Sequence, residues 1–451
     1  MTSEHYDTVI VGAGFAGLTA ARELTGSGQR VLLVEARDRI GGRTWLDRRL
    51  GLDIELGGTW VHWTQPYAWA ELHRYGLDVV PSPEPEMAWW QVDGRPTAVT
   101  PEILLELLDE PNRELGAESR AAFPQPFAPL RSADVARLDA LRLSDRLDAC
   151  ELDPARRTLL RAFWTLNFNG RLDEAAYTQA LRWLAVANGD WKVMFEACAS
   201  YKIVGGTRAL ADAMLADSTA ELRLGAHVAA VIDNAGGTHV ELASGETISA
   251  DAVIMTAPLH ALSRIRFDPP LPPESERAVS SGQLGLGTKV WLSIAGELPH
   301  FVAFGDEADP FTFLQSEYHV DGRTLVIGFG PDAHGVDAAD VNAVQAAVDR
   351  LVPGLTVLDS AGHDWTADPL SGETWPMHRT GYLTTGLPAL QAGHGPVIFA
   401  GSDIADGWGG FIDGAIESGL SAARKVTAAD RRRLASSARR SVPSAITRVT
   451  R

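Results

Sequence analysis

Residues 8–14 read TVIVGAG, an apolar run that ends in Gly12 and Gly14 and leads, through Gly17, into a helix-like stretch to about Leu24. A strand, a glycine turn and a helix in this order place the free N–H groups of the helix where they can bind phosphate. Gly12 permits the tight turn, Gly14 lets the backbone approach a pyrophosphate, and Gly17 lets the helix pack closely on the strand. The segment therefore predicts a dinucleotide site.

Two further stretches complete this site. Residues 30–34 form a second apolar run that ends at Glu35, where a carboxylate can accept hydrogen bonds from ribose hydroxyls and disfavours the 2′-phosphate of NADP. Near the other end, residues 397–420 read VIFAGSDIADGWGGFIDGAIESGL, a strand, a glycine turn, an acidic residue and a helix. Together they indicate one nucleotide site built from both ends of the chain, with a flavin as the suggested ligand.

Composition narrows the class of protein. The chain has 451 residues, 45% hydrophobic and 22% charged, which is typical of a soluble globular enzyme with two or more domains. Its net charge of −18 argues against a nucleic-acid partner and mildly favours cationic small molecules. Cys150 and Cys198 have no metal-site or CxxC spacing, so we expect a reducing, cytoplasmic location. We expect no membrane span, because no apolar stretch is long enough to form one. We expect no signal peptide, because the chain enters a strand within eight residues.

The nucleotide-binding signals fall in three separated blocks with two inserts between them. In the second block, HVAAVIDN and THVELAS are joined by Ala-Gly-Gly, which predicts a hairpin of antiparallel strands. The first insert is mostly helical in period, and the second begins with alternating strand patterns such as KVWLSIAG and continues to a helix near residues 337–352. We expect an α/β fold with a discontinuous Rossmann-like cofactor domain and a discontinuous α+β substrate domain. The cofactor domain comprises residues 1–80, 200–289 and 386–428, and the substrate domain comprises residues 81–199 and 290–385.

The last stretch, residues 429–451, carries seven arginines, many small residues and almost no large apolar residue. This composition predicts a disordered basic tail, with a partner-binding tail as the alternative. The rest of the sequence contains no HExxH, GxSxG or Walker A motif, and its histidines show no metal spacing. A bound cofactor must then carry the reaction, which points to redox chemistry.

Four longer motifs resemble the flavin-dependent monoamine oxidase family: EARDRIGGRTW (35–45), ELGGTWVHWTQP (55–66), IVGGTRALADAM (203–214) and FAGSDIADGWGGFIDGAIESG (399–419). The resemblance spans nearly the whole chain. Within the family, WTADPLSGETW (365–375) and GSDIADGWGGFIDGA (401–415) look most like bacterial amine oxidases of the 6-hydroxynicotine oxidase type. The resemblance implies a glutathione-reductase-like FAD-binding domain.

The resemblance also implies which residues hold FAD. Arg43 matches the position that meets the pyrophosphate, Val228 lies in the strand that brackets the adenine, and Asp403 matches an acidic position near the ribityl chain, where the family usually has glutamate. Thr374 occupies the place of the flavin-linking cysteine of mammalian monoamine oxidases, so we expect non-covalent FAD. The other residues implied at the cofactor are Gly57, Gly58 and Thr59 against the flavin ring, Gly401 in the Gly-Ser-Asp turn, and Trp408 beside the ring system.

For catalysis, the resemblance nominates five residues. Trp375 and Phe411 match the aromatic pair in front of the flavin, where mammalian enzymes have two tyrosines. Lys289 matches the lysine that holds a water at flavin N5, with an exposed strand lysine as the alternative. His62 is a candidate proton acceptor for an ammonium substrate, or a structural histidine, and Asn167 is a candidate hydrogen-bonding partner for a heterocycle, or a loop asparagine.

The predicted reaction is oxidation of a small primary or secondary amine, cyclic amines included, to an imine, with dioxygen reoxidising the flavin to give hydrogen peroxide. Three alternatives stay open: a non-catalytic flavoprotein, a desaturase acting on carbon–carbon bonds, and an L-amino-acid oxidase. The last would need a buried arginine for the substrate carboxylate, for which Arg161, Arg171 and Arg182 are candidates. A homodimer is expected only from the resemblance, and no metal is expected.

Overall fold

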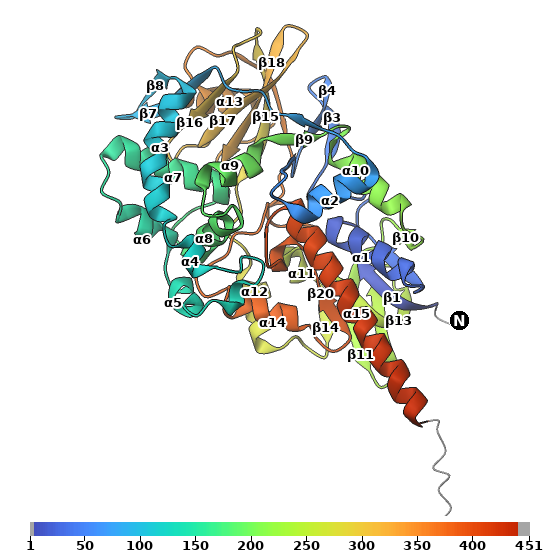
Figure 1. Cartoon of the computed structure of the whole chain (residues 1–451). Coiled ribbons are helices and arrows are strands. Elements are labelled where there is room, and N and C mark those ends of the chain that lie inside the picture. Colours follow the sequence, from blue (N-terminus) through green and yellow to red (C-terminus); the bar gives the residue numbers. More distant parts are fainter. Residues whose placement is uncertain (1–3, 441–451) are drawn as a thin grey trace, which may run out of the picture.

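The computed structural model describes residues 4–440 and contains two large β-sheets in separate parts of the molecule (Figure 1). The first sheet has eight strands and holds the predicted nucleotide-binding segments. Its parallel centre joins β2 (Val31–Val34), β1 (His5–Val11) and β13 (Thr247–Met255), and β10 (Glu221–Arg223) pairs with β2 at one edge. Every residue of β2 is buried, as expected for a parallel strand covered on both faces.

The other side of β13 has two partners. Its first half pairs antiparallel with β12 (Gly237–Leu242), and its last residues pair parallel with β20 (Val397–Phe399). β12 forms the predicted hairpin with β11 (Val228–Asn234), and β14 (Arg266–Asp268) pairs with β11. Because β1, β13 and β20 run parallel, their carboxyl ends meet at one edge of the sheet. The fold therefore brings both ends of the chain to one place.

Helices cover this sheet. α1 (Phe15–Gly26) packs against α15 (Ile412–Arg440) so closely that a Cβ atom at Gly419 would lie 2.4 Å from the carbonyl oxygen of Ala16. A Cβ atom at Gly17 would lie 1.9 Å from the oxygen of Gly12, so Gly17 has the packing role that the sequence predicts. α2 (Pro66–Tyr75) and α10 (Gly206–Ala216) pack beside these two helices.

The course of α15 corrects one prediction. The sequence predicts a disordered basic tail from residue 429, but α15 continues as a helix through Arg440. Alanine and arginine are strong helix formers, and Asp430 accepts a hydrogen bond from Gln29 beyond the predicted start of the tail. Figure 1 shows this end of the helix projecting from the body of the molecule. Residues 441–451 of the predicted tail lie outside the described residues.

The second sheet has seven strands, and α13 (Val341–Leu351) covers one of its faces. Side chains alternate along β15: Val290 and Leu292 pack with α13 in one core, while Lys289 and Trp291 are on the opposite face. In spatial order the strands are β19 (Val357–Gly362), β15 (Thr288–Ala295), β18 (Arg323–Gly330), β17 (Phe313–Val320), β16 (Phe301–Phe304), β7 (Met87–Val92) and β8 (Arg95–Val99).

The hairpin of β7 and β8 is a feature that the sequence analysis missed, because it lies in the insert predicted to be mostly helical. Asp93 and Gly94 both have positive φ angles, 51° and 72°, and form its turn. An Asp-Gly pair between two strand-like runs is a strong signal for a two-residue hairpin, so the sequence contained the information.

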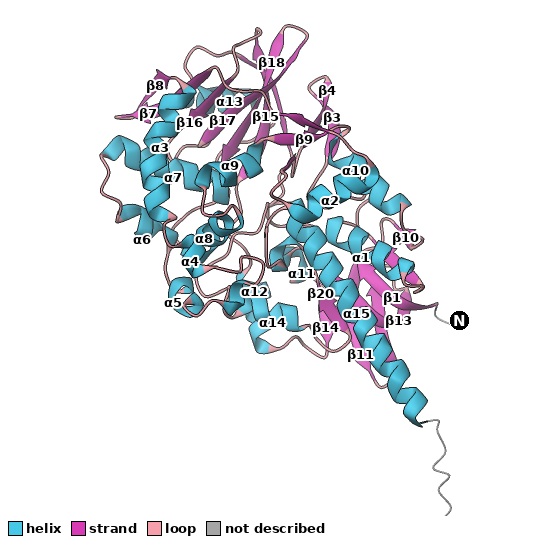
Figure 2. Cartoon of the chain, viewed as in Figure 1, coloured by secondary structure: helices cyan, strands magenta, loops and turns pink. Residues whose placement is uncertain are grey.

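Most of the remaining helices belong to the first insert, and Figure 2 shows these helices beside and below the second sheet, on the left of the view. None of the described helices is long and apolar enough to cross a membrane. The helices of the first insert are α3 (Pro101–Leu115), α4 (Ser119–Ala122), η1 (Pro129–Arg131), α5 (Val135–Asp139), α6 (Leu143–Asp148), α7 (Pro154–Phe168), α8 (Tyr177–Val186) and α9 (Trp191–Ala199). The others are α11 (Leu259–Leu262), α12 (Pro273–Ser281), α14 (Gly386–Ala392), η2 (Ser402–Ile404) and the small strands β3 (Leu46–Arg49), β4 (Leu52–Glu55), β5 (Trp60–Val61), β6 (Val79–Pro81) and β9 (Tyr201–Ile203).

Candidate active site

A cavity of about 520 Å³ extends from the carboxyl edge of the first sheet to the uncovered face of the second. Both ends of the chain line it. Thirteen of the predicted site residues are among the residues that line the cavity: Gly12, Gly14, Glu35, Arg43, Gly57, Gly58, Thr59, Asn167, Val228, Lys289, Trp375, Gly401 and Phe411.

The nucleotide end of the cavity has the features that a dinucleotide needs. Gly12 has a φ angle of 104°, and Gly14 begins α1 without a side-chain cap, so the first N–H groups of the helix remain available to phosphate. Glu35 accepts hydrogen bonds from the N–H groups of Ala13 (2.7 Å) and Arg37 (2.8 Å), which fixes its carboxylate at the end of β2. The residues present therefore fit the adenosine and pyrophosphate of FAD.

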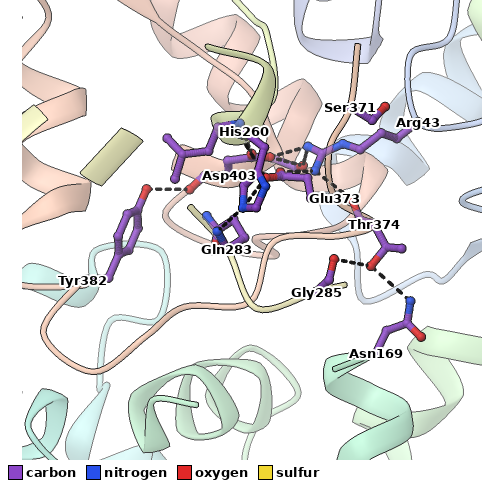
Figure 3. A network of polar contacts seen from close by, with 12 residues as sticks. Arg43, Asn169, His260, Gln283, Gly285, Ser371, Glu373, Thr374, Tyr382 and Asp403 are labelled. Carbon is purple, nitrogen blue, oxygen red and sulfur yellow. Dashed lines mark hydrogen bonds and ion pairs between the residues drawn. The ribbon is translucent and has the colours of Figure 1, made fainter. Parts of the chain in front are cut away.

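Arg43 is held by two carboxyl groups (Figure 3). Its Nη1 lies 2.7 Å from Oε1 of Glu373 and donates to the oxygen of Thr374 (2.9 Å), while its Nη2 is paired with Asp403 and donates to Oγ of Ser402 (3.0 Å). The guanidinium is thus fixed at the cavity wall by contacts from residues 373–374 and 402–403. Its predicted role at the pyrophosphate stays a prediction.

The two carboxyl groups on Arg43 differ in charge. Burial and the neighbouring Asp403 raise the pKa of Glu373, whose side chain is fully buried, well above its usual range. Burial would also raise the pKa of Asp403, but Arg43 and the hydrogen bonds that Asp403 accepts lower it to about 2. Two carboxyl groups that share one site cannot both ionise easily, so Glu373 keeps its proton and Asp403 balances the charge of Arg43.

Thr374 lines the cavity, and its hydroxyl group both donates and accepts a hydrogen bond. Its Oγ1 donates to the oxygen of Gly285 (2.9 Å) and accepts a hydrogen bond from Nδ2 of Asn169 (3.0 Å), as Figure 3 shows. A threonine held in this way offers no thiolate for a thioether bond, which is consistent with the prediction of non-covalent FAD.

Lys289 lies on β15 at the wall of the cavity and is 5% exposed. Its Nζ donates to the oxygen of Gly57 (2.9 Å) and to Oγ1 of Thr59 (2.7 Å), so the protonated form has a third N–H without an acceptor among the described residues. Burial lowers the pKa of Lys289 to about 7, although Glu55 and Glu317 act in the opposite direction. This lysine is therefore a buried amine that can gain or lose its proton near neutral pH, a property common among catalytic groups.

The other half of the cavity has aromatic walls. Trp375 is fixed by a hydrogen bond from its Nε1 to the oxygen of Asn167 (2.9 Å), and Phe411 packs edge-on against Trp183 at 4.9 Å. The two rings lie on adjacent loops, since Gly410 lies against Pro376. The remaining aromatic side chains that line this half are Trp60, Phe195, Phe313 and Phe329.

Asp403 and Trp408 were predicted to contact the cofactor, but neither is among the residues that line the cavity. Asp403 instead holds Arg43 and accepts a hydrogen bond from the N–H of Leu259 (3.0 Å). Trp408 is fully buried behind Phe411, at a ring distance of 5.0 Å, and donates to the oxygen of Thr64 (2.9 Å). Both therefore support residues of the cavity wall.

His62 was predicted as a candidate proton acceptor near the substrate, and the structure places it elsewhere. β5 ends at Val61, a hydrogen bond from the N–H of Gln65 to the oxygen of His62 closes the turn that follows, and His62 is not among the residues that line the cavity. The ring stacks on Tyr201 at 5.7 Å and its Nδ1 lies 2.8 Å from Oγ1 of Thr64. Burial lowers its pKa. Its place outside the cavity lining favours the structural alternative, and a role in proton transfer stays a prediction.

The arginines considered for an L-amino-acid oxidase do not reach the cavity either. Arg182 donates to the backbone oxygens of Ala405 (2.9 Å) and Asp406 (3.0 Å). Arg161 pairs with Asp148 and Glu307, and Arg171 is exposed. The arginines that do line the cavity, Arg37, Arg43 and Arg264, belong to the nucleotide-binding segments rather than to α7–α9.

Several site residues were missed by the sequence analysis. Glu373 is one residue from Thr374, but its partnership with Asp403 depends on the tertiary fold. Phe313 and Phe329 face each other across β17 and β18, and Phe329 also faces Lys289 across β18 and β15. The alternating pattern of these strands was visible in the sequence, but their order in the sheet was not.

Comparison with known proteins agrees with this geometry. Residues 15–427 match the family model described as flavin containing amine oxidoreductase. The chain is 36% identical over 421 residues to pseudooxynicotine dehydrogenase of a Pseudomonas species, covering 92% of this chain and 84% of that protein. It is 30% identical over 440 residues to (S)-6-hydroxynicotine oxidase of Paenarthrobacter nicotinovorans, with coverages of 92% and 97%. A solved structure of a triple mutant of putrescine oxidase superposes with a TM-score of 0.82 at 24% identity, over 94% of this chain and 99% of that one, and so shares the fold.

Proposed function

The chain belongs to the family of flavin-containing amine oxidoreductases, and from that premise we propose that it oxidises a small primary or secondary amine, cyclic amines included, to an imine. FAD is its cofactor and, when bound, supplies the acceptor for the hydride equivalent that leaves the α-carbon of the amine. The reaction removes two electrons and two protons from the C–N unit. The imine then reacts with water to give a carbonyl compound and the released amine or ammonia.

The observation that carries the proposal is the composition of the aromatic half of the cavity. Lys289 is the cation at this end, and among the described residues that line the cavity the only carboxylate is Glu35, at the nucleotide end. A pocket of this kind favours a neutral amine, because an ammonium ion would find no counter-charge and would be repelled by protonated Lys289. Trp375 and Phe411 exclude water and orient the amine between them.

The composition of the aromatic half also argues against two other activities, the oxidation of diamines and the oxidation of α-amino acids. A diamine would need a carboxylate for its second ammonium group, and an α-amino acid would need an arginine for its carboxylate. The described residues of the aromatic half offer neither. We therefore propose a monoamine as the substrate class.

The electron acceptor is a separate proposal. We infer that dioxygen takes up the two electrons and two protons to give hydrogen peroxide, with the free N–H of Lys289 stabilising the negative charge that develops on oxygen. One relative is named a dehydrogenase and another an oxidase, so their names favour neither acceptor. A cytoplasmic location and a homodimer complete the proposal, and gel filtration of the holoenzyme tests the latter.

A panel assay tests the substrate class. The purified holoenzyme is incubated in air with benzylamine, pyrrolidine derivatives, putrescine and L-amino acids, and oxygen uptake and hydrogen peroxide are recorded. We expect turnover with monoamines and at least tenfold lower kcat/KM with putrescine and amino acids. Preferred turnover of an L-amino acid would contradict the proposal, and amine consumption only with an artificial electron acceptor would contradict the role of dioxygen.

A further inference from the structure

Gln315 lies on the face of β17 that lines the cavity, two residues beyond Phe313, while Leu314 between them packs into the core under α13. In the sheet, Phe313 is opposite Phe329, which is opposite Lys289, and Gln315 is opposite Ile327. With strands about 4.8 Å apart and about 3.4 Å per residue, Gln315 is roughly 12 Å from Lys289 along the sheet. It therefore lines the part of the cavity remote from Lys289.

The orientation of the Gln315 amide is fixed from behind. Its Nε2 donates a hydrogen bond of 2.7 Å to Oε1 of Glu317, whose Oε2 is ion-paired with Nζ of Lys202. All three side chains are buried, and Nζ of Lys202 also lies 4.1 Å from the ring centre of Tyr318. Burial raises the pKa of the Glu317 carboxyl, and the ammonium group of Lys202 in contact with it offsets that rise.

A carboxylate accepts hydrogen bonds and cannot donate them, so the NH₂ group of Gln315 must face Glu317. The amide oxygen is on the other branch of the amide, and the described residues donate no hydrogen bond to it. Glu317 is positioned for this contact at an irregularity of β17, where the register with β18 shifts between Ser316 and Tyr318. The ion pair of Glu317 and Lys202 thus holds the amide so that Oε1 of Gln315 is its free hydrogen-bond acceptor.

The other amides of this region are already engaged. Asn167 donates through Nδ2 to the oxygen of Phe163 (2.7 Å), and its Oδ1 accepts a weak hydrogen bond from Sγ of Cys198 (3.7 Å). Asn169 also lines the cavity, but its Oδ1, which has no partner among the described residues, is itself a buried atom. Gln315 is accordingly the amide side chain, among the described residues that line the aromatic half, with a free and accessible acceptor.

This inference rests on the proposed function. We propose that Gln315 is a specificity-determining residue, and that its Oε1 accepts a hydrogen bond from a hydroxyl or N–H group at the end of the substrate remote from the reacting amine. Lys202 and Glu317 are positioning residues that hold the Gln315 amide in this orientation. The substrate class is therefore an amine with an apolar or aromatic body and a distal hydrogen-bond donor.

A matched pair of amines tests this inference. Tyramine and 2-phenylethylamine differ only in a distal hydroxyl group, and their apparent Kd values and limiting rates are measured by anaerobic rapid mixing with the holoenzyme, following flavin absorbance. We expect the wild type to bind tyramine about two- to tenfold more tightly, as one buried hydrogen bond allows. In Gln315→Met this preference should disappear while the limiting rate of bleaching changes less than twofold, because Lys289 and Trp375 are untouched.

Two further variants complete the test. Leu314→Met changes the same strand on its opposite face and should keep the wild-type preference. Glu317→Gln frees the Gln315 amide to rotate and should lose the preference without a change in limiting rate; if this variant does not fold, Gln315→Met remains decisive. No preference in the wild type, or a preference that survives in Gln315→Met, would overturn the inference. Preferential binding of tyramine without bleaching by either amine would instead support the role of Gln315 and contradict the proposed oxidation.

Discussion

Replacing Glu373 by glutamine should have little effect on stability, because only one of the two carboxyl groups on Arg43 carries a charge. Glutamine has the shape of the protonated acid: its oxygen can accept from Arg43 and from the N–H of His260, and its NH₂ can donate to Asp403. The double variant Glu373→Gln/Asp403→Asn removes both acids and leaves the Arg43 guanidinium, whose side chain is 20% exposed, without a carboxylate partner from the protein. If Glu373 is neutral, Glu373→Gln should be much more stable than the double variant. If Glu373 is charged, Glu373→Gln should itself lose much of its stability.

The size of the effect follows from the burial of the site. Breaking a buried ion pair by removing one partner costs about 3–5 kcal/mol, whereas an isosteric exchange of a neutral group costs about 1 kcal/mol or less. Unfolding entropy of about 2.1 cal/mol/K per residue gives the chain on the order of 0.9 kcal/mol/K if it unfolds in one transition. The double variant should then lose roughly 3–5 °C of Tm, and Glu373→Gln roughly 1 °C or less.

The assay is thermal unfolding of the holoenzyme, followed by the fluorescence of released FAD, at fixed protein and free FAD concentrations because ligand binding shifts Tm. The raised pKa of Glu373 also fixes the sign of a pH effect: its stabilising contribution is complete below about pH 4.5 and is lost as pH rises through the raised value. Glutamine does not titrate, so Glu373→Gln does not lose stability in this way. The Tm of the variant should therefore rise relative to the Tm of the wild type as the buffer becomes alkaline. A fall of 3 °C or more in Glu373→Gln at neutral pH would refute a neutral Glu373.

Three further predictions concern the cofactor and Lys289. Lys289→Met should slow turnover or flavin reoxidation by about tenfold or more. In the wild type the rate of flavin reoxidation should fall as pH rises through about 7, where Lys289 loses its proton, and the variant should show no such fall; unchanged stopped-flow rates would contradict the assignment. Gly57→Ala would place a Cβ atom 2.0 Å from the oxygen of Arg43, so the purified variant should show a lower ratio of flavin to protein absorbance, while Gly26→Ala, with no neighbour within 4 Å, should match the wild type. Acid precipitation should release the flavin into the supernatant, since Thr374 offers no thiolate, and flavin retained in the pellet would show a covalent link.

Local patterns in the sequence were sufficient to predict much of the nucleotide-binding part of the fold. The glycine turn at Gly12 and Gly14, the strand that ends at Glu35 and the hairpin of β11 and β12 all depend on short stretches of chain, and the structure contains each of them. The motif-based resemblance nominated Lys289, Trp375 and Phe411, which line one cavity although they are far apart in the sequence, and their catalytic roles stay predictions. The predictions of the turn, the strand and the hairpin succeeded because spacing and residue type constrain the backbone directly.

The remaining site residues depend on information that no single segment carries. Gln315 reaches the cavity through the strand order of the second sheet. Glu373 keeps its proton because it is buried beside Asp403, which is thirty residues away in the chain. His62 follows Thr59 closely in sequence, yet its ring is buried against Tyr201 and is not among the residues that line the cavity. Sheet order, buried charge pairing and turn direction are properties of the folded chain.

The most direct test of amine oxidation is anaerobic mixing of the purified holoenzyme with one monoamine, such as benzylamine or tyramine, while the flavin band at roughly 450 nm is followed. The account predicts bleaching that saturates at one equivalent of amine for each FAD, with one equivalent of carbonyl product after hydrolysis of the imine. An oxidised spectrum that persists with every amine tested, in a protein that retains its flavin, would contradict it.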